Sequence, residues 1–300
     1  MVWRRWKRRS SVNKMKRFSA LLLCLMLLGG CAPQAANTQE CVAVLFSSYA
    51  DMWQQAGGRV DITVGESVER GFVPEGTPLV DAGAGKSINV ELLLSHKPTL
   101  VIYSTDIPAQ AEAAELLKKS GIEVRGYHVE SYEDYRAAML DMAAGSRKTE
   151  QTLSAIDARI DAAKSSRKDK ERPKILFVRA GSSASSTKAK LPKDHFACAM
   201  LEELGCTNVA QKAPVLLDGL SIEAILKEQP EHIFFSMMGD ETAARQNIEE
   251  ILKSEPWQAL SAVQEGRVHI LPKELFHFKP NERWGESYEY LADILNGENL

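Results

Sequence analysis

Residues 90–104, VELLLSHKPTLVIYS, and residues 222–236, IEAILKEQPEHIFFS, match each other at a constant offset of 132 residues. Each copy predicts a helix that ends before a proline, followed by a buried strand, because proline cannot continue a helix. The identical pairs are Glu91/Glu223, Leu94/Leu226, Pro98/Pro230 and Ser104/Ser236. The repeat therefore predicts two related halves, each built from strands and helices.

Short apolar runs alternate with helical patterns on both sides of the two copies. Such alternation predicts parallel sheets with helical crossovers, which places the chain in the α/β class. The predicted strands are 42–46, 62–64, 100–103, 124–128, 174–178, 232–236 and 268–271, and the predicted helices include 109–119 and 243–253.

The middle of the chain has a different pattern. Apolar residues recur at helical spacing after Gly145, and they predict a helix of about 20 residues, or about 30 Å. A charged run and Pro173 end it. A helix of this length is a rigid connection, unlike a Gly/Ser-rich linker. We therefore expect two Rossmann-like lobes, residues 41–145 and 173–300, joined by a long rigid helix within residues 146–172.

The net charge of −3 averages two unlike segments. Residues 1–30 contain eight Lys/Arg and no acid, so the remaining residues hold 29 basic and 40 acidic side chains, a net charge of −11. An acidic body argues against nucleic acid as a partner, since binding to phosphates needs a basic face.

The basic stretch is followed by eleven uncharged residues, from Phe18 to Leu28. A membrane-spanning helix needs about 20, so residues 1–30 are predicted to be a signal peptide. Gly29, Gly30 and Cys31 resemble the bacterial lipoprotein signal, in which the cysteine is lipidated. Residues 31–40 then form a flexible tether, and the folded part lies at the outer face of the cytoplasmic membrane. Met1 and Met15 both remain possible start sites.

Three further cysteines lie in the body, Cys41, Cys198 and Cys206, and none forms a CxxC pair. This pattern supports neither a disulfide framework nor a zinc site. Cys198 and Cys206 are interpreted as small buried hydrophobic residues.

Several features together resemble one family: the lipoprotein signal, the pattern N-V-E-x-L-L-x-x-x-P-x-x-V-I at 89–102, the central helix and S-I-E-x-I-L-x-x-x-P at 221–230. The closing segment 256–272 is also typical of it. The family comprises the solute-binding lipoproteins of ABC importers for iron–siderophore complexes, haem and vitamin B12. The resemblance covers roughly residues 41–296.

The resemblance implies a class III periplasmic-binding-protein fold, with a helical hinge that opens and closes little. It implies no catalysis and no resident cofactor, because the ligand is the transported cargo. The implied partners are the transmembrane subunits of an ABC permease, an iron-complex ligand and the membrane, through the lipid anchor. The protein itself is expected to be a monomer.

Glu91 and Glu223 have two interpretations. Asn89 and Ser221 look like helix N-caps, and a glutamate in the first turn interacts favourably with the helix dipole. In the family, glutamates matching these two positions dock onto arginines of the paired permease subunits. Both interpretations predict the same helix starts.

Residues that contact the ligand should follow strand ends, because α/β sheets bind ligands outside the carboxyl ends of their strands. His277, in the loop 273–281, is the best placed histidine by this criterion. The resemblance and this criterion together select Ser48, Tyr49, Tyr103, Arg179, Met237, Met238, His277, Arg283 and Trp284.

The segment 179–193 is a basic exception within the acidic body. It carries Arg179, Lys188, Lys190 and Lys193 and no acid. A basic patch at a cleft favours an anionic ligand such as a ferric chelate, a haem with its propionates or a corrinoid phosphate. A solvated surface loop is the alternative interpretation.

The expected cargo is an iron complex, either a siderophore or haem. Haem would take Tyr, His or Met as an axial ligand, and Tyr49 and His277 are candidates, whereas an intact siderophore needs none. A free metal ion is not expected, since no compact His/Asp/Glu cluster follows the strand ends. The alternatives are a cobamide carrier, which the 7% aromatic content disfavours, and an extracytoplasmic α/β enzyme, which lacks a G-x-S-x-G or H-E-x-x-H motif here.

Overall fold

The computed structural model describes residues 40–81, 87–168 and 170–297. The predicted signal peptide, Cys31 and nearly all of the tether lie outside these residues. The chain divides into two units at Glu40 and Cys41, and the architecture below is that of the second unit. Among the described helices, none has the length and apolar character needed to cross a membrane.

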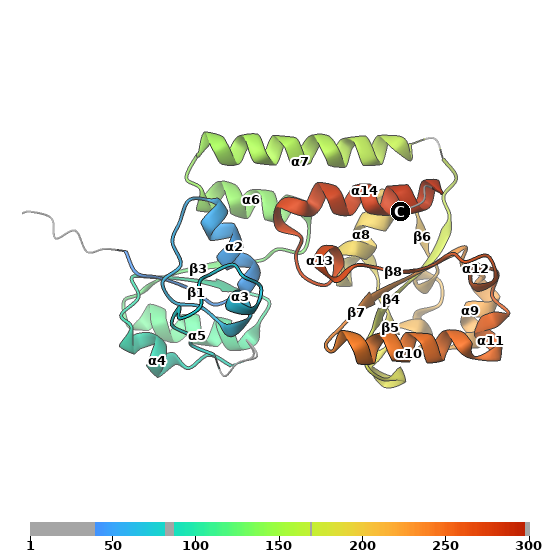
Figure 1. Ribbon diagram of the computed structural model, residues 1–300, viewed down its shortest axis with the longest axis horizontal. Helices are drawn as coiled ribbons and strands as arrows, with labels where there is room; N and C mark the ends of the chain where they lie inside the picture. The colour runs from blue at the N-terminus through green and yellow to red at the C-terminus, as the bar shows by residue number, and fades with distance from the viewer. Residues whose placement is uncertain (1–39, 82–86, 169, 298–300) are drawn as a thin grey trace, which may run out of the picture. The chain divides into compact units, whose positions relative to one another are not determined.

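The first lobe contains a parallel sheet of order β1-β2-β3 with helices packed around it (Figure 1). Its strands are β1 (Val42–Val44), β2 (Leu100–Ser104) and β3 (Glu123–Tyr127). Its helices are α2 (Ser47–Gln55), α3 (Gly65–Glu69), α4 (Val90–Ser95), α5 (Pro108–Lys119) and α6 (Tyr132–Met142).

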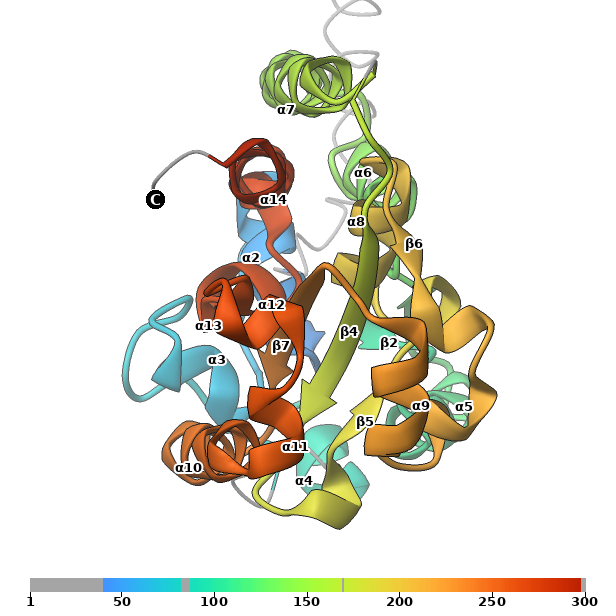
Figure 2. The ribbon, with the colours of Figure 1, turned by 90° about the vertical axis from the view of Figure 1, so that its right-hand side faces the viewer.

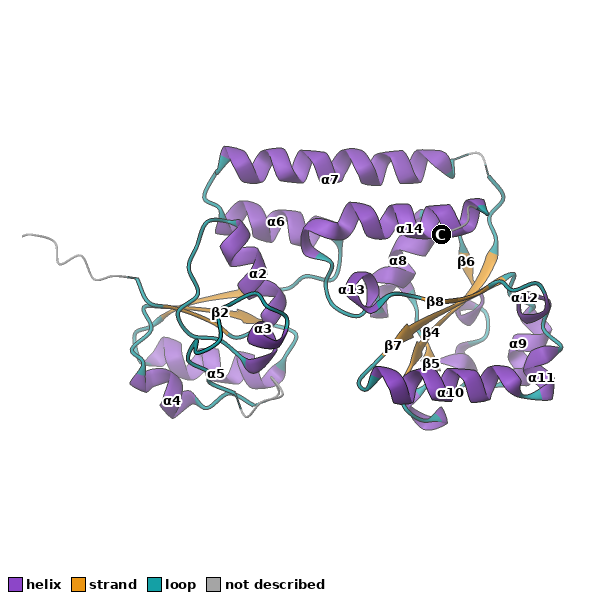
Figure 3. Ribbon diagram, in the orientation of Figure 1, coloured by secondary structure: helices purple, strands orange, loops and turns teal. Residues whose placement is uncertain are grey.

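The second lobe contains a sheet of order β5-β4-β7-β8, and β6 also pairs with β4. Only β5 runs antiparallel to its neighbour. The strands are β4 (Lys174–Ala180), β5 (Lys188–Ala189), β6 (Thr207–Asn208), β7 (His232–Met237) and β8 (Val268–Ile270). The helices are α8 (Phe196–Glu203), α9 (Ile222–Glu228), α10 (Glu241–Lys253), α11 (Glu255–Gln258), α12 (Ser261–Gln264) and α13 (Lys273–Phe276). Figure 3 shows helices flanking the strands of both sheets.

The central strands are buried along almost their whole length, as expected for parallel strands covered on both faces. β7 buries every residue after His232, and β2 buries every residue except Tyr103. The predicted strand 62–64 is wrong. It forms only isolated bridges, Ala43 with Ile62 and Thr63 with Leu79, because α3 begins immediately after it.

The internal repeat is preserved in the backbone. Asn89 accepts a hydrogen bond from the Leu92 amide at 2.9 Å, and Ser221 accepts one from Ala224 at 3.4 Å, so both predicted N-caps are present. Each helix is followed by a residue in a left-handed conformation, Lys97 (φ 52°) or Gln229 (φ 49°), directly before the proline. This conformation ends both helices and turns the chain into its strand.

The connecting helix α7 (Arg147–Ser166) packs along the last helix, α14 (Trp284–Asn296), and also contacts α6. Figures 1 and 2 show α7 beside both of these helices. Arg159 of α7 binds the Glu289 carboxylate of α14 through two nitrogens, at 2.8 and 2.5 Å. The connection between the lobes is thus a pair of packed helices, α7 and α14, rather than a single isolated helix.

One hydrophobic core runs through both lobes and the hinge. Trp284, at the start of α14, is 1% exposed. Its ring lies 6.2 Å from Tyr132 and 6.3 Å from Tyr135 of α6, and 5.6 Å from Phe196 of α8, centroid to centroid. This aromatic cluster joins the two lobes directly.

Candidate functional site

A cationic pocket lies at the end of β4 in the second lobe. Its volume is about 210 Å³, and it is lined by Arg179, Ser186, Lys188, Lys190 and Met238. Arg179 and Lys188 are adjacent across the antiparallel pair formed by β4 and β5, so the sheet itself gathers the charges.

The three cations of this pocket have no partner within the part of the chain that the structure describes. No hydrogen bond or ion pair is formed there by the side chain of Arg179, Lys188 or Lys190, although all three are partly buried. Burial lowers the pKa of Arg179, and the negative charge of Glu130 partly offsets this effect. Partly buried cations without a counter-charge are costly, so the pocket is suited to an anion supplied by a ligand.

His277 lies beside this pocket, after α13. Its Nδ1 is 2.6 Å from the main-chain oxygen of Met237 at the end of β7. Burial lowers its pKa, the hydrogen bond to Met237 partly offsets this effect, and the nearby charges of Lys273 and Arg179 lower the pKa further. A neutral ring that donates from Nδ1 leaves Nε2 with a free lone pair, the form in which histidine binds metals.

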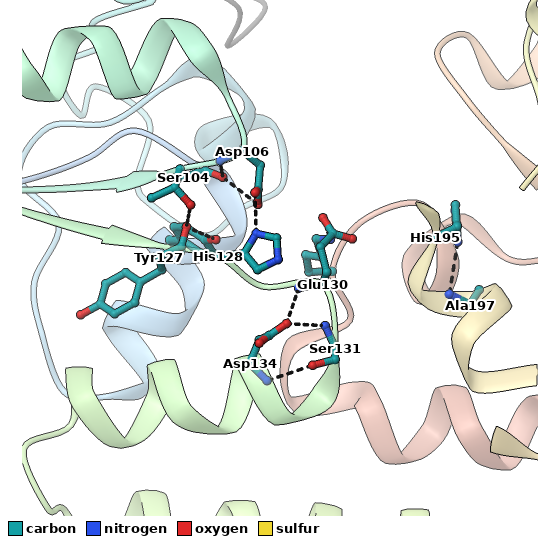
Figure 4. Close-up of polar contacts among 12 residues, drawn as sticks. Ser104, Asp106, Tyr127, His128, Glu130, Ser131, Asp134, His195 and Ala197 are labelled. Atoms are coloured by element: carbon teal, nitrogen blue, oxygen red, sulfur yellow. Dashed lines mark hydrogen bonds and ion pairs between the residues drawn. The ribbon is translucent and has the colours of Figure 1, made fainter. Parts of the chain in front are cut away.

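His195 is a structural residue among the same cations. It is buried at the start of α8, where Nδ1 accepts a hydrogen bond from the Ala197 amide at 3.2 Å (Figure 4). Burial, together with the charges of Arg179 and Lys279, lowers its pKa to about 3. His195 is therefore neutral and caps the helix without adding charge.

The first lobe contributes acidic groups beyond β2 and β3. His128 Nδ1 lies 2.5 Å from Asp106 Oδ1, and Figure 4 shows Glu130 beside this pair at the start of α6. The bond to Asp106 is the main cause that raises the pKa of His128. A raised histidine pKa stabilises the fold at pH values below the unfolded pKa, and this contribution is lost as the pH rises through the folded value.

Replacing Asp106 by asparagine should lower the pKa of His128 toward its ordinary value of 6.5. The physical reason is the loss of the carboxylate that favours the imidazolium. An NMR pH titration of the imidazole protons measures this directly, with His277 as an internal reference. An unchanged His128 pKa would contradict the pairing.

A short segment after α13 ties the second lobe to the first. Lys279 Nζ lies 2.7 Å from Glu130 Oε1. Asn281, in a left-handed conformation (φ 52°), donates to the Ser48 oxygen at 3.0 Å and to Asp51 at 2.6 Å. These contacts hold the segment of the second lobe against the first lobe.

Arg70 strengthens the same junction. Its guanidinium lies 4.5 Å from the ring centroid of Phe72 and 4.0 Å from that of Phe278, so aromatic rings from both lobes contact it. It also donates to the hydroxyls of Ser47 and Ser48 at 3.0 and 3.1 Å. A second cavity, of about 400 Å³, lies here between residues of both lobes, including Arg70, Phe278 and Arg283.

The structure brings Arg179, Met238 and His277 together, but it places other predicted ligand residues elsewhere. Ser48 and Tyr49 are 1% exposed, and the Tyr49 hydroxyl donates to the Tyr127 oxygen at 3.0 Å. Trp284 lies in the core of the hinge, as described above.

Met237 is 5% exposed and belongs to the core of the second lobe. Arg283 lines the larger cavity while pairing with Glu286 at 2.6 Å. Tyr103 is half-buried, and its ring packs directly on Gly126. A Cβ atom on residue 126 would lie only 2.6 Å from this ring, so the contact requires glycine there.

The family model for periplasmic binding proteins matches residues 42–275. The chain belongs to this family. A search of curated protein sequences gave no match. The predicted fold class is confirmed, and the family is one of binding proteins rather than enzymes.

Solved structures of other periplasmic binding proteins share this fold. The haem-binding protein RhuT of Roseiflexus sp. RS-1 has a TM-score of 0.67 at 17% identity, covering 86% of this chain and 98% of its own. SirA of Staphylococcus aureus complexed with staphyloferrin B has a TM-score of 0.66 at 18% sequence identity. The match covers 86% of this chain and 93% of SirA. The vitamin B12-binding protein BtuF of Vibrio cholerae has a TM-score of 0.66 at 19% sequence identity. The match covers 86% of this chain and 96% of BtuF.

Three charged residues at the junction of the lobes of this periplasmic binding protein were not selected from the sequence. Arg70 escaped the strand-end criterion because it follows a short helix. Glu130 does follow a strand, β3, but no signal in the sequence marks an acidic residue as part of a site for an anionic ligand. Lys279 lies in the selected loop, yet its partner could not be identified from sequence.

Neither a metal-binding cluster nor a cysteine pair is found among the described residues. No cluster of three or more His, Cys, Asp or Glu side chains that could hold a metal ion occurs there. Cys198 and Cys206 are buried and unpaired, as interpreted from the sequence, and burial raises the pKa of both thiols.

Proposed function

We propose that this periplasmic binding protein captures an anionic iron complex, a siderophore chelate or haem, between its lobes and delivers it to an ABC importer. The observation that carries the proposal is the cationic pocket, in which Arg179, Lys188 and Lys190 surround a cavity without a partner of their own among the described residues. The carboxylates of a ferric chelate or the propionates of haem would supply the missing charge. Structures of the same fold bind haem and staphyloferrin B, which agrees with this choice.

His277 is the axial ligand that we propose if the cargo is haem. Its Nδ1 is held by the Met237 oxygen, so Nε2 is the nitrogen available to iron. Tyr49 is less suitable, because its hydroxyl is buried and bonded to Tyr127. An intact siderophore would need only the cations and the surrounding aromatic rings.

We further propose that the mature protein is a monomer anchored by a lipid on Cys31 at the outer face of the cytoplasmic membrane. Glu91 and Glu223 would contact the two permease subunits. Both are exposed in the first turn of their helices. α4 also exposes Leu92 (40%) and Leu94 (36%) beside Glu91.

The cargo is tested by titrating the purified protein with haem, ferric citrate and cobalamin and following the absorption spectra. Haem or the ferric chelate should bind, and Arg179→Gln should weaken that binding about tenfold or more, since a charge-assisted contact is lost. Arg245→Gln, which removes an exposed arginine of α10, is the matched control and should have no effect. For haem, His277→Ala should also change the Soret band.

Two outcomes would reject this cargo. Binding of cobalamin alone would identify a corrinoid carrier, and binding of none of the three ligands would remove the iron-complex assignment altogether.

A further inference from the structure

Glu130 is an acidic residue placed against the cations of the opposite lobe. It belongs to the loop between β3 and α6 in the first lobe, while Lys279, its partner at 2.7 Å, comes from the segment after α13. The Lys279 side chain is 14% exposed and the Glu130 side chain 42%. The lysine is therefore nearly enclosed, whereas water and solutes can reach the carboxylate.

The position of Glu130 is fixed by its own backbone. The amides of Glu130 and Ser131 both donate to Asp134 Oδ2 at 3.0 Å, and Ser131 Oγ accepts from the Asp134 amide at 3.1 Å. This capping box at the start of α6 is visible in Figure 4. The backbone of Glu130 is thus held by a helix terminus rather than by a free loop, and its carboxylate contacts Lys279 of the second lobe.

The charge of Glu130 also reaches the cationic pocket. It favours the charged form of Arg179, which has no hydrogen bond or ion pair of its own among the described residues. Arg179 and Lys190 line the cationic pocket. Lys279 Nζ lies 5.4 Å from the ring centroid of Phe196, and this ring stacks on His195 at 5.0 Å. The charges of all three cations lower the pKa of His195. Glu130 of the first lobe pairs with one of these cations, Lys279, and its charge acts on another, Arg179.

We propose that Glu130 is a resident carboxylate that occupies the cation cluster in the empty protein and is displaced from Lys279 by a carboxylate of the cargo. The inference rests on the proposed function, because it assumes an anionic cargo in this cleft. The exchange keeps the enclosed lysine paired when no cargo is present, which avoids an uncompensated buried charge. The exchange also makes binding selective, because an anion must both replace Glu130 at Lys279 and bind Arg179. A small monovalent anion cannot do both and is disfavoured.

The test uses the purified full-length protein and iron-free citrate as the probe, with affinity measured by calorimetry at low salt. Glu130→Gln removes the competing charge but keeps the size of the side chain, so citrate should bind about fivefold more tightly, the equivalent of one exposed ion pair. The gain should shrink as salt is added, because the interaction is screened.

Glu289→Gln is the matched control. Glu289 has a similar exposure, is paired with Arg159 on the hinge helices and carries the same charge, so its removal should leave citrate affinity unchanged. An equal gain in both variants would show a general charge effect and overturn the proposal. Unchanged or weaker binding in Glu130→Gln, or no citrate binding by either protein, would also overturn it.

The two proposals fail separately. If citrate behaves as expected while neither haem nor ferric citrate binds, the exchange at Glu130 stands and the cargo assignment falls. If a ferric complex binds and Glu130→Gln gives no gain in citrate affinity, the cargo stands and the exchange falls.

Discussion

Protein carrying both Glu91→Lys and Glu223→Lys should bind cargo as tightly as the wild type, yet cells that depend on it should lose cargo uptake by at least about a hundredfold. The two glutamates begin equivalent helices of the internal repeat, α4 and α9, and both are exposed. Lysine at these positions would place like charges against permease arginines. Each helix loses about 0.5 kcal/mol of dipole stabilisation, too little to unfold the lobe.

Uptake of labelled cargo by cells, set beside calorimetry on the purified variant, separates docking from capture. Glu150→Lys with Glu250→Lys changes the net charge equally at two exposed positions on α7 and α10, and this pair should transport normally. Normal uptake by the Glu91/Glu223 variant would refute docking through these residues and leave them as helix-stabilising acids.

The second large effect is expected at Trp284. Replacing it by alanine should lower the free energy of unfolding by about 3–5 kcal/mol, because a buried aromatic ring is lost from a packed core. The rings of Tyr132, Tyr135 and Phe196 would then border a cavity that joins both lobes and the hinge.

Urea denaturation measures this change, and Trp284→Phe is the control, expected to cost less because it retains a ring. Leu116→Ala, at a side chain 52% exposed, should have almost no effect. If Trp284→Ala lowers the free energy of unfolding by less than about 1 kcal/mol, Trp284 does not hold the two lobes together, because removing an aromatic ring from a packed core usually costs more.

The parts of the fold that depend on local pattern were predictable from the sequence. The repeat, the buried strands and the long helix each leave a periodic signal, and Asn89 and Ser221 mark helix starts by a short-range hydrogen bond. The strand-end criterion also selected Arg179, Met238 and His277, and the structure places them near one another because the carboxyl ends of parallel strands lie at one edge of a sheet.

The parts that depend on packing were not predictable. The sequence around Trp284 does not show whether its ring packs in the hinge or lines the ligand cleft. Its position is set by contacts with α6 and α8, which are distant in the chain. The contact of Lys279 with Glu130 and that of Arg70 with Phe278 join residues far apart in the chain. Residues that follow a strand directly are found by topology, whereas those that reach the cleft from a helix end or a returning loop require the coordinates.

The neutral cap formed by His195 has a consequence for the conditions under which the protein can work. The positive charge of the pocket is carried by Arg179, Lys188 and Lys190, whereas burial lowers the pKa of His195 to about 3 and so keeps this ring from adding to that charge. Burial also lowers the pKa of His277, which favours the neutral form of this second ring. The attraction of the pocket for an anion therefore does not depend on the protonation of either histidine.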